Sequence, residues 1–213
     1  MNNNGKTKKT EQKNEGNERE KARRIEVLTV IGQIEGHYAL PEGSKSTGYD
    51  EILPYLASVE NDPETAGLLI LLNTVGGDVE AGLAIAEMIA GMRKKTVSLV
   101  LGGGHSIGIP IAVAADVSFI VPTGTMTLHP VRYTGLVMSA PQSFNYLAGM
   151  QERILAFLGT HSHADPEAVR ALMLKNEDMA NDLGTILVGE EAVRLGLIDR
   201  VGGLGDALEE LRR

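Results

Sequence analysis

The chain contains no cysteine and no tryptophan, and only eight of its 213 residues are Phe or Tyr. Because cysteine is missing, disulfide bonds and thiolate metal sites are excluded. Long apolar runs are missing too, since the longest, Ile107–Val121, is too short to cross a membrane and contains Asp116. No apolar segment follows the basic N-terminal stretch, so we expect no secretory signal. These absences favour a cytoplasmic protein without a membrane span.

Positive charge is scarce outside the N-terminal stretch. The formal net charge is −8 at pH 7, and residues 1–24 contribute +4 to it, which leaves −12 on residues 25–213. An acidic body disfavours nucleic acid as the main partner. Residues 1–24 have almost nothing to bury, so we expect a disordered polar tail ahead of one folded domain at residues 25–213. A tail without a specific partner is favoured over one that docks to an acidic protein or a membrane surface.

Strand-like and helix-like segments alternate along the folded part, which predicts an α/β fold. The run Ala66–Leu72 is apolar throughout, as expected for a strand covered on both faces in a parallel sheet. Two successive units of strand, glycine turn and helix follow, and their turns are expected at the carboxyl ends of the strands, where ligand sites gather. The predicted strands are 25–34, 66–72, 96–101, 117–121, 125–129, 186–188 and 198–201, and the predicted helices are 50–60, 79–92, one starting at 106, 142–159, 166–175, 190–195 and 204–213.

The second of these glycine turns carries one serine. Gly102, Gly103 and Gly104 predict a tight turn, and an apolar helical pattern is expected to start at Ser106. A helix that begins there directs its free amides and the positive end of its dipole at the space beside the hydroxyl, which suits a developing oxyanion. Ser106 is therefore a candidate nucleophile. The alternative is that Ser106 only caps the helix, and the corner by itself favours the cap.

A hydroxyl nucleophile needs a base within reach. His129 ends a predicted strand at the same sheet edge as Ser106, and Pro130 keeps its backbone extended. The alternative for His129 is a purely structural role. His105 is expected to face away from Ser106, and His161 and His163 lie in a polar connection between helices, so all three are poorer candidates.

The oxyanion of such a reaction needs hydrogen-bond donors. The glycine pair Gly76 and Gly77 lies one strand-helix unit before the serine, and Ile107 follows the serine directly. Their backbone amides are the candidate donors. The alternative for the glycines is close packing of a helix on the sheet, and the two roles are compatible.

Four segments in a fixed order carry a resemblance to a known family. They are Asn73–Gly77 with the glycine pair, Gly104–Gly108 with the serine, Met126–Pro130 with the histidine, and Glu191–Asp199, which reads Glu-Ala-Val-Arg-Leu-Gly-Leu-Ile-Asp. Over about residues 25–201 this pattern resembles the ClpP serine peptidase family. Gly104–Gly108 also matches the G-x-S-x-G motif of α/β hydrolases, but that fold places its histidine late, where this chain is mainly helical.

The resemblance implies a ClpP/crotonase-type fold, a spiral of β-β-α units with a mainly parallel sheet and a protruding helical handle. It implies a serine endopeptidase for unfolded proteins or peptides, with Ser106 as nucleophile, His129 as base, and Gly76, Gly77 and Ile107 around the oxyanion. No metal or organic cofactor is implied. Stacked heptameric rings are implied as well, with contacts through the helices of residues 142–175. An AAA+ unfoldase is a candidate partner, although the polar residues 1–24 replace the apolar segment that touches this ATPase in the family.

The sequence departs from the family pattern at the acid of the catalytic triad. The family's aspartate aligns with Gly184, so we predict that Asp182 is the acid, with Asp178 as a weaker candidate and water or no group as alternatives. These departures, with an inserted loop at Gly36–Tyr49, resemble a subgroup from spore-forming Gram-positive bacteria whose name links it to protein translocation. Two other functions stay open: a non-catalytic scaffold or chaperone in secretion, and a crotonase-like acyl-CoA enzyme.

Overall fold

The computed structural model describes residues 24–133, 139–175 and 184–213. The predicted tail therefore lies outside the described residues, except for Arg24, which begins the first strand. The elements are, in chain order, β1 (Arg24–Glu35), β2 (Ser46–Gly48), α1 (Tyr49–Asn61), β3 (Thr65–Gly77), α2 (Val79–Ala90), β4 (Lys95–Gly104), α3 (Gly108–Val113), β5 (Val117–Ile120), β6 (Thr125–Leu128), α4 (Ala140–His161), α5 (Pro166–Met173), β7 (Thr185–Val188), α6 (Glu190–Arg194), β8 (Arg200–Val201) and α7 (Leu204–Leu211).

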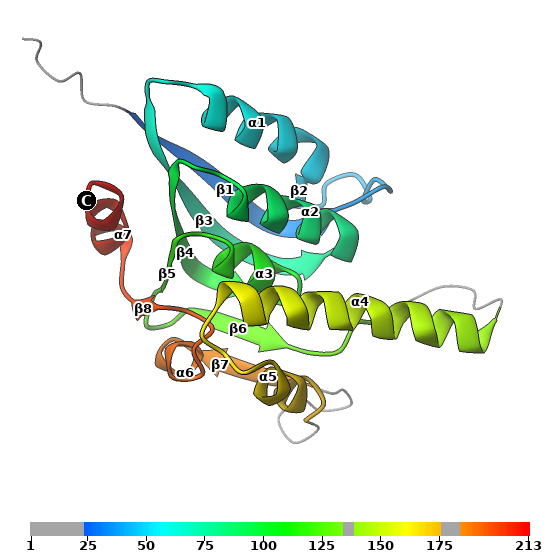
Figure 1. Ribbon diagram of the computed structural model, residues 1–213. Coiled ribbons are helices and arrows are strands. Elements are labelled where there is room, and N and C mark those ends of the chain that lie inside the picture. Colours follow the sequence, from blue (N-terminus) through cyan, green and yellow to red (C-terminus); the bar gives the residue numbers. More distant parts are fainter. Residues whose placement is uncertain (1–23, 134–138, 176–183) are drawn as a thin grey trace, which may run out of the picture.

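A mainly parallel sheet forms the centre of the fold (Figure 1). Its strands follow the order β2-β1-β3-β4-β5-β8, and all of these pairs are parallel. β6 pairs with the end of β4 through Gly103 and Thr125, and β7 runs antiparallel to β6. Parallel neighbours need crossover connections, which α1, α2 and α3 supply. The expected mixed α/β fold with a mainly parallel sheet is confirmed.

β3 is covered on both faces, as its continuous apolar run predicts. Ile70 and Leu72 face the cluster that packs under α1, α2 and α3. Leu69 points to the other face, where it belongs to a second cluster with Leu211 of α7. Figure 1 shows α7 on the opposite side of the sheet from the other large helices. Apolar packing on both faces therefore fixes β3 in the segment that leads to the candidate site.

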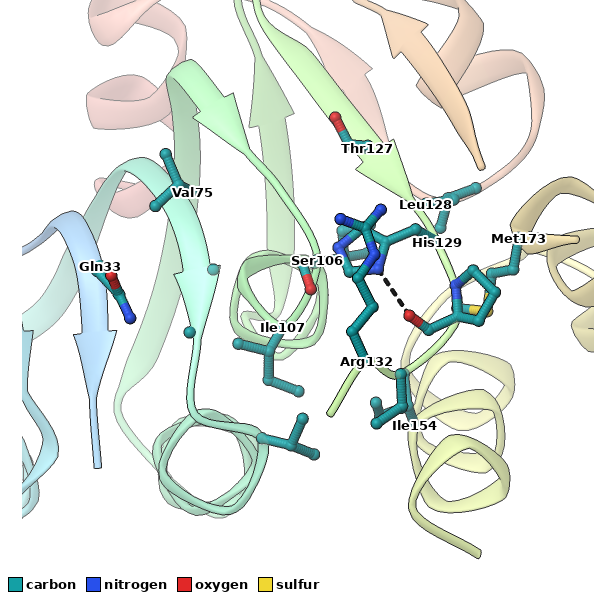
Figure 2. A pocket seen from close by; sticks show the side chains of 16 residues that line it. Gln33, Val75, Ser106, Ile107, Thr127, Leu128, His129, Arg132, Ile154 and Met173 are labelled. Carbon is teal, nitrogen blue, oxygen red and sulfur yellow. Dashed lines mark hydrogen bonds between the residues drawn. The ribbon is translucent and has the colours of Figure 1, made fainter. Parts of the chain in front are cut away.

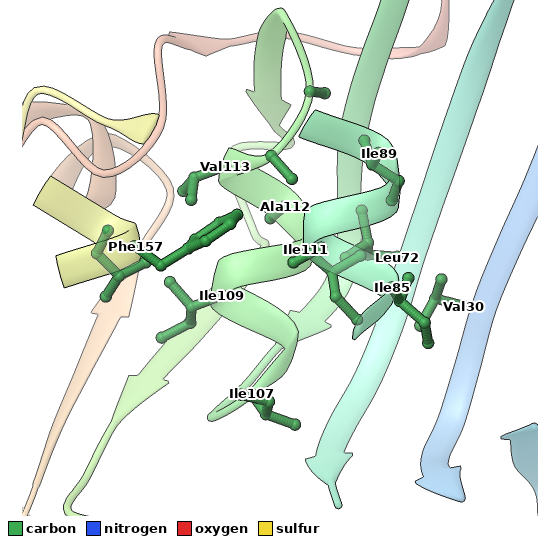
Figure 3. Packing of buried hydrophobic residues seen from close by; sticks show 14 of the residues in the cluster. Val30, Leu72, Ile85, Ile89, Ile107, Ile109, Ile111, Ala112, Val113 and Phe157 are labelled. Atoms are coloured by element: carbon green, nitrogen blue, oxygen red, sulfur yellow. The ribbon is translucent and has the colours of Figure 1, made fainter. Parts of the chain in front are cut away.

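The helix α3 is buried over its whole length. Figure 3 shows Ile109 and Ile111, with Ile107 just before the helix, among side chains of α2, β3 and α4. Burying a side chain of this size contributes about 1.5–3 kcal/mol. The corner between β4 and α3, which carries Ser106, is thus anchored directly in the core.

The helix α4 projects beyond the rest of the fold (Figure 1). Its buried residues, Ile154, Leu155, Phe157 and Leu158, all lie in its second half. In the first half, the side chain of Phe144 is 72% exposed and that of Tyr146 is 59% exposed. The predicted protruding helical handle is confirmed.

The two predicted glycine turns begin too early, because the strands continue through the glycines and the chain turns only after them. β3 runs on to Gly77, since Gly76 and Gly77 pair with Gln33 and Ile34 of β1 after a shift in register. β4 runs on through its three glycines to Gly104. Extended glycine and turn glycine have the same sequence signature, and only the neighbouring strand distinguishes them.

None of the helices in the described ranges combines the length and the apolar composition needed to span a bilayer.

Candidate active site

Ser106 lies at the corner between β4 and α3 with a positive φ of 55°. It is the only residue other than glycine with positive φ among the described residues, and this backbone region disfavours L-amino acids. The predicted helix start at Ser106 is two residues too early, since α3 begins at Gly108 with Ile107 in the N-cap position. The hydroxyl of Ser106 makes no hydrogen bond within the described part of the chain. The capping interpretation of Ser106 is therefore wrong.

Backbone hydrogen bonds hold this corner in place. The amide of Ser106 donates to the carbonyl of Thr127 in β6 at 2.9 Å. The carbonyl of Ser106 accepts from the amide of Ile109 at 3.0 Å, and the carbonyl of His105 accepts from that of Gly108 at 2.9 Å. Such bonds are what maintains an unfavourable backbone conformation.

Ser106 and His129 line the same cavity, which has a volume of about 280 Å³ (Figure 2). Gly76, Gly77 and Ile107 line it too, so the structure brings together every predicted site residue that it describes. The sequence analysis assigned no role to the other residues that line it, some of which neighbour the predicted residues in sequence while others come from distant parts of the chain. These are Gln33, Val75, Val79, Ile109, Thr127, Leu128, Pro130, Val131, Arg132, Ile154 and Met173.

The imidazole of His129 is oriented by its own neighbour. Its Nδ1 lies 2.7 Å from the carbonyl oxygen of Pro130, drawn as the dashed line in Figure 2. When Nδ1 carries the proton, it donates to this carbonyl and leaves Nε2 as the basic nitrogen. Among the described residues, no hydrogen bond joins His129 to Ser106. Hydrogen bonds of this kind are often long before substrate binds.

The three backbone amides predicted to bind the oxyanion differ in whether they are already hydrogen-bonded. The amide of Gly76 donates to Thr74 Oγ1 at 3.0 Å, so it is already engaged. The amide of Asp78 donates to the carbonyl of Ile34 in β1 at 3.0 Å. The amide of Ile107 has no acceptor within the described ranges. Gly77 and Ile107 therefore stay candidate donors, whereas the amide of Gly76, which lies against Ser106, is already engaged.

His105 lies behind the nucleophile rather than in the cavity. Its Nδ1 is 2.8 Å from Thr127 Oγ1, and the residue does not line the cavity, as predicted. Burial lowers the pKa of His105 below its ordinary value, and the nearby His129 lowers it further. His105 is therefore neutral at neutral pH and is not placed to act as the base.

Gly184 stands beside His129 in the register of the sheet. Leu128 pairs with Thr185 in the antiparallel ladder of β6 and β7, so the next residues outward are His129 and Gly184. Gly184 has a φ of 142°, and its amide donates to the carbonyl of Lys175 at 2.6 Å. The predicted acid Asp182 and its alternative Asp178 lie outside the described residues.

Two further histidines, His161 and His163, do not line this cavity. His161 packs its ring on Phe157 at 4.2 Å between centroids, and the His163 side chain is 85% exposed, with its Nε2 3.7 Å from Asp199. Within residues 24–133, 139–175 and 184–213, no three His, Asp or Glu side chains gather closely enough to hold a metal ion.

Comparison with known proteins gives matches over most of the chain. Residues 22–204 match the profile of the Clp protease family. The chain is 57% identical over 187 residues to the translocation-enhancing protein TepA of Halalkalibacterium halodurans, with 88% of this chain and 73% of that protein covered. It is 27% identical over 112 residues to an ATP-dependent Clp protease proteolytic subunit of Streptococcus agalactiae, with 51% and 52% covered. A solved ClpP1 variant from Listeria monocytogenes has a similar structure, with a TM-score of 0.65, 20% identity, and coverage of 85% of this chain and 94% of that one.

Proposed function

Because this chain belongs to the Clp protease family, we propose that it is a serine endopeptidase that cleaves unfolded proteins or peptides. The resemblance to this family and to its translocation-linked subgroup, predicted from the sequence, is confirmed. The observation that carries the proposal is that Ser106 and His129, which follow different strands, line one cavity together with Gly77 and Ile107.

In the proposed reaction, Ser106 Oγ attacks the carbonyl carbon of the scissile peptide bond. His129 Nε2 takes the hydroxyl proton and then gives it to the leaving amine, while an ester forms between Ser106 and the acyl part of the substrate. The amides of Gly77 and Ile107 donate to the oxyanion. Water then hydrolyses the ester with His129 again as base. In the neutral ring, the carbonyl of Pro130 favours the tautomer that carries its proton on Nδ1 and leaves Nε2 as the acceptor.

The proposed acid is Asp182, with Asp178 as its alternative. In a triad, the carboxylate holds the histidine in the right tautomer and stabilises the cation that forms during attack. Gly184 cannot do this, because it has no side chain. Pro130 already fills the first of these roles with a neutral dipole, so a chain without any acid retains an oriented base.

The test is covalent labelling with a fluorophosphonate probe, read by intact mass. The wild type is expected to gain one adduct, while Ser106→Ala and His129→Ala gain none although both stay folded by circular dichroism. Labelling at a serine other than Ser106, or no labelling of folded wild type, contradicts the proposal.

A second candidate is a non-catalytic scaffold or chaperone in secretion. Gly184 at the acid position favours it, and so does the name of the TepA relative, a translocation-enhancing protein. Restoration of secretion by Ser106→Ala in a deletion strain supports the scaffold, whereas failure of this variant alone supports the peptidase. An acyl-CoA enzyme, the third candidate, has no independent support.

We further propose that the chain assembles into stacked heptameric rings. The exposed Phe144 and Tyr146 on the projecting half of α4 support a contact through this helix. Native mass spectrometry is expected to give fourteen copies, and Phe144→Glu with Tyr146→Glu is expected to give seven. Polypeptide chains are the proposed substrates, and docking to an AAA+ unfoldase and a cytoplasmic location stay predictions.

A further inference from the structure

We propose that His105 and Thr127 form a clamp that positions Ser106 for attack, an inference that rests on the proposed peptidase function. Neither residue is the nucleophile or the base. The His105–Thr127 clamp is the side-chain contact between these two residues, together with the backbone bond from Ser106 to Thr127.

The clamp ties the serine corner to the strand that carries the base. His105 Nδ1 lies 2.8 Å from Thr127 Oγ1, and the Ser106 amide donates to the Thr127 carbonyl at 2.9 Å. One bond uses the side chain of Thr127 and the other uses its main chain. Thr127 lies in β6, and His129 follows the last residue of that strand directly. The clamp therefore sets the position of nucleophile relative to base.

The clamp also continues to the oxyanion side of the cavity. The amide of His105 donates to the carbonyl of Thr74 at 3.2 Å. Thr74 Oγ1 in turn accepts from the amide of Gly76 and donates to the carbonyl of Gly32 at 2.6 Å. β3, the serine corner and β6 are thus joined by consecutive hydrogen bonds that pass through His105.

Ser106 needs such a tie because of its backbone. A left-handed conformation costs a residue with a Cβ about 1–2 kcal/mol, so a released corner relaxes toward negative φ. That relaxation rotates the Cα–Cβ bond and moves Oγ out of line with His129. A displacement of about 1 Å at a reacting atom lowers a rate by up to about a hundredfold.

The sequence makes room for the imidazole ring. A Cβ at Gly103 would lie 2.4 Å from His105 Nε2, so the ring lies over the bare backbone of β4. The nearest atoms to a Cβ at the adjacent Gly104 would instead be side-chain atoms of Val100 and Met126, at 3.2 Å and beyond. These two glycines therefore offer a matched pair of substitutions, one that displaces His105 and one that does not.

The test measures fluorophosphonate inactivation of the full chain, with the rate at saturating probe separated from the probe affinity. Thr127→Val removes Oγ1 but keeps the shape and the backbone carbonyl. It is expected to lower the saturating rate about five- to tenfold, the equivalent of one hydrogen bond, with unchanged probe affinity. Thr127→Ser is expected to restore the rate to within about twofold. Gly103→Ala is expected to have a lower rate at saturating probe than Gly104→Ala.

The outcomes separate the clamp from the proposed function. Wild type that does not label, or that labels away from Ser106, overturns the peptidase proposal itself. Wild type that labels at Ser106 while Thr127→Val keeps its full saturating rate overturns the clamp alone. A variant that loses only probe affinity also overturns it, because Thr127 then acts as part of the cavity wall. Should Thr127→Val fail to fold, Gly103→Ala and Gly104→Ala test the clamp in its place. Equal saturating rates for these two variants overturn it.

Discussion

A Cβ placed on Gly76 would lie 2.7 Å from the Cβ of Ser106 and 3.3 Å from its Oγ. The end of β3 therefore packs against the nucleophile with no side chain between them. Because the amide of Gly76 is bonded to Thr74, the contribution of this glycine to the site is its small volume.

Gly76→Ala is expected to lower the rate of fluorophosphonate labelling at least about a hundredfold, since the new methyl group displaces the serine. Gly43→Ala is the matched control, because Gly43 has the same φ of 86° but nothing within 4 Å. Both variants are expected to lose about 1 kcal/mol of stability from the backbone alone. Equal labelling of the two variants would falsify a steric role for Gly76.

Ser106→Gly is expected to be more stable than Ser106→Ala by about 0.5–1 kcal/mol. Glycine adopts the φ of 55° without steric cost, and part of this gain is offset by the greater entropy of glycine in the unfolded chain. Both variants lack the hydroxyl, so the comparison isolates the backbone. Urea unfolding at pH 7 measures the difference, and a less stable glycine variant would contradict strain at this position.

The stability of the chain is expected to decline toward acid pH partly through His105. Its pKa is lowered in the folded state, so as pH falls below about 6.5 the unfolded chain binds a proton at this residue that the folded chain does not bind. The free energy of unfolding then decreases until the pH reaches the lowered pKa. His105→Gln removes this titration. Between pH 7 and pH 5, the free energy of unfolding measured in urea is expected to decline less for the variant than for wild type. Equal declines would argue against a contribution from His105.

Asp182→Asn tests the proposed acid. If Asp182 orients His129 in a triad, the substitution is expected to lower the rate of peptide cleavage by about 10⁴-fold. Asp178→Asn is the matched control, and it is expected to stay close to wild type. A reversed result assigns the role to Asp178. Full activity in both variants indicates that the Pro130 carbonyl suffices to orient the base.

Much of the candidate site could be predicted from local sequence. Ser106 and His129 were identified because each follows a strand of a parallel sheet, and the ends of such strands meet at one edge. The roles of the glycines were less predictable. Gly76, Gly77 and Gly102–Gly104 look like turns, but they lie in strands whose extension depends on β1 and β3.

The remaining features depend on contacts between distant segments. His105 was correctly rejected as a base, but its bond to Thr127 requires that β6 lie beside the end of β4. Arg132 lines the cavity without belonging to any motif. The hydrogen bond between His129 and the Pro130 carbonyl depends on a side-chain rotamer, which sequence does not specify.

The positive φ of Ser106 also limits the chemical repertoire of the fold. Cysteine has a single γ atom, as serine does, so Ser106→Cys is expected to fold and to offer a thiolate to alkylating reagents. Threonine is branched at Cβ, and a branched residue is a steric outlier in this backbone region. The corner can therefore present a serine or a cysteine to a substrate, but it excludes threonine, the nucleophile on which other peptidases are built.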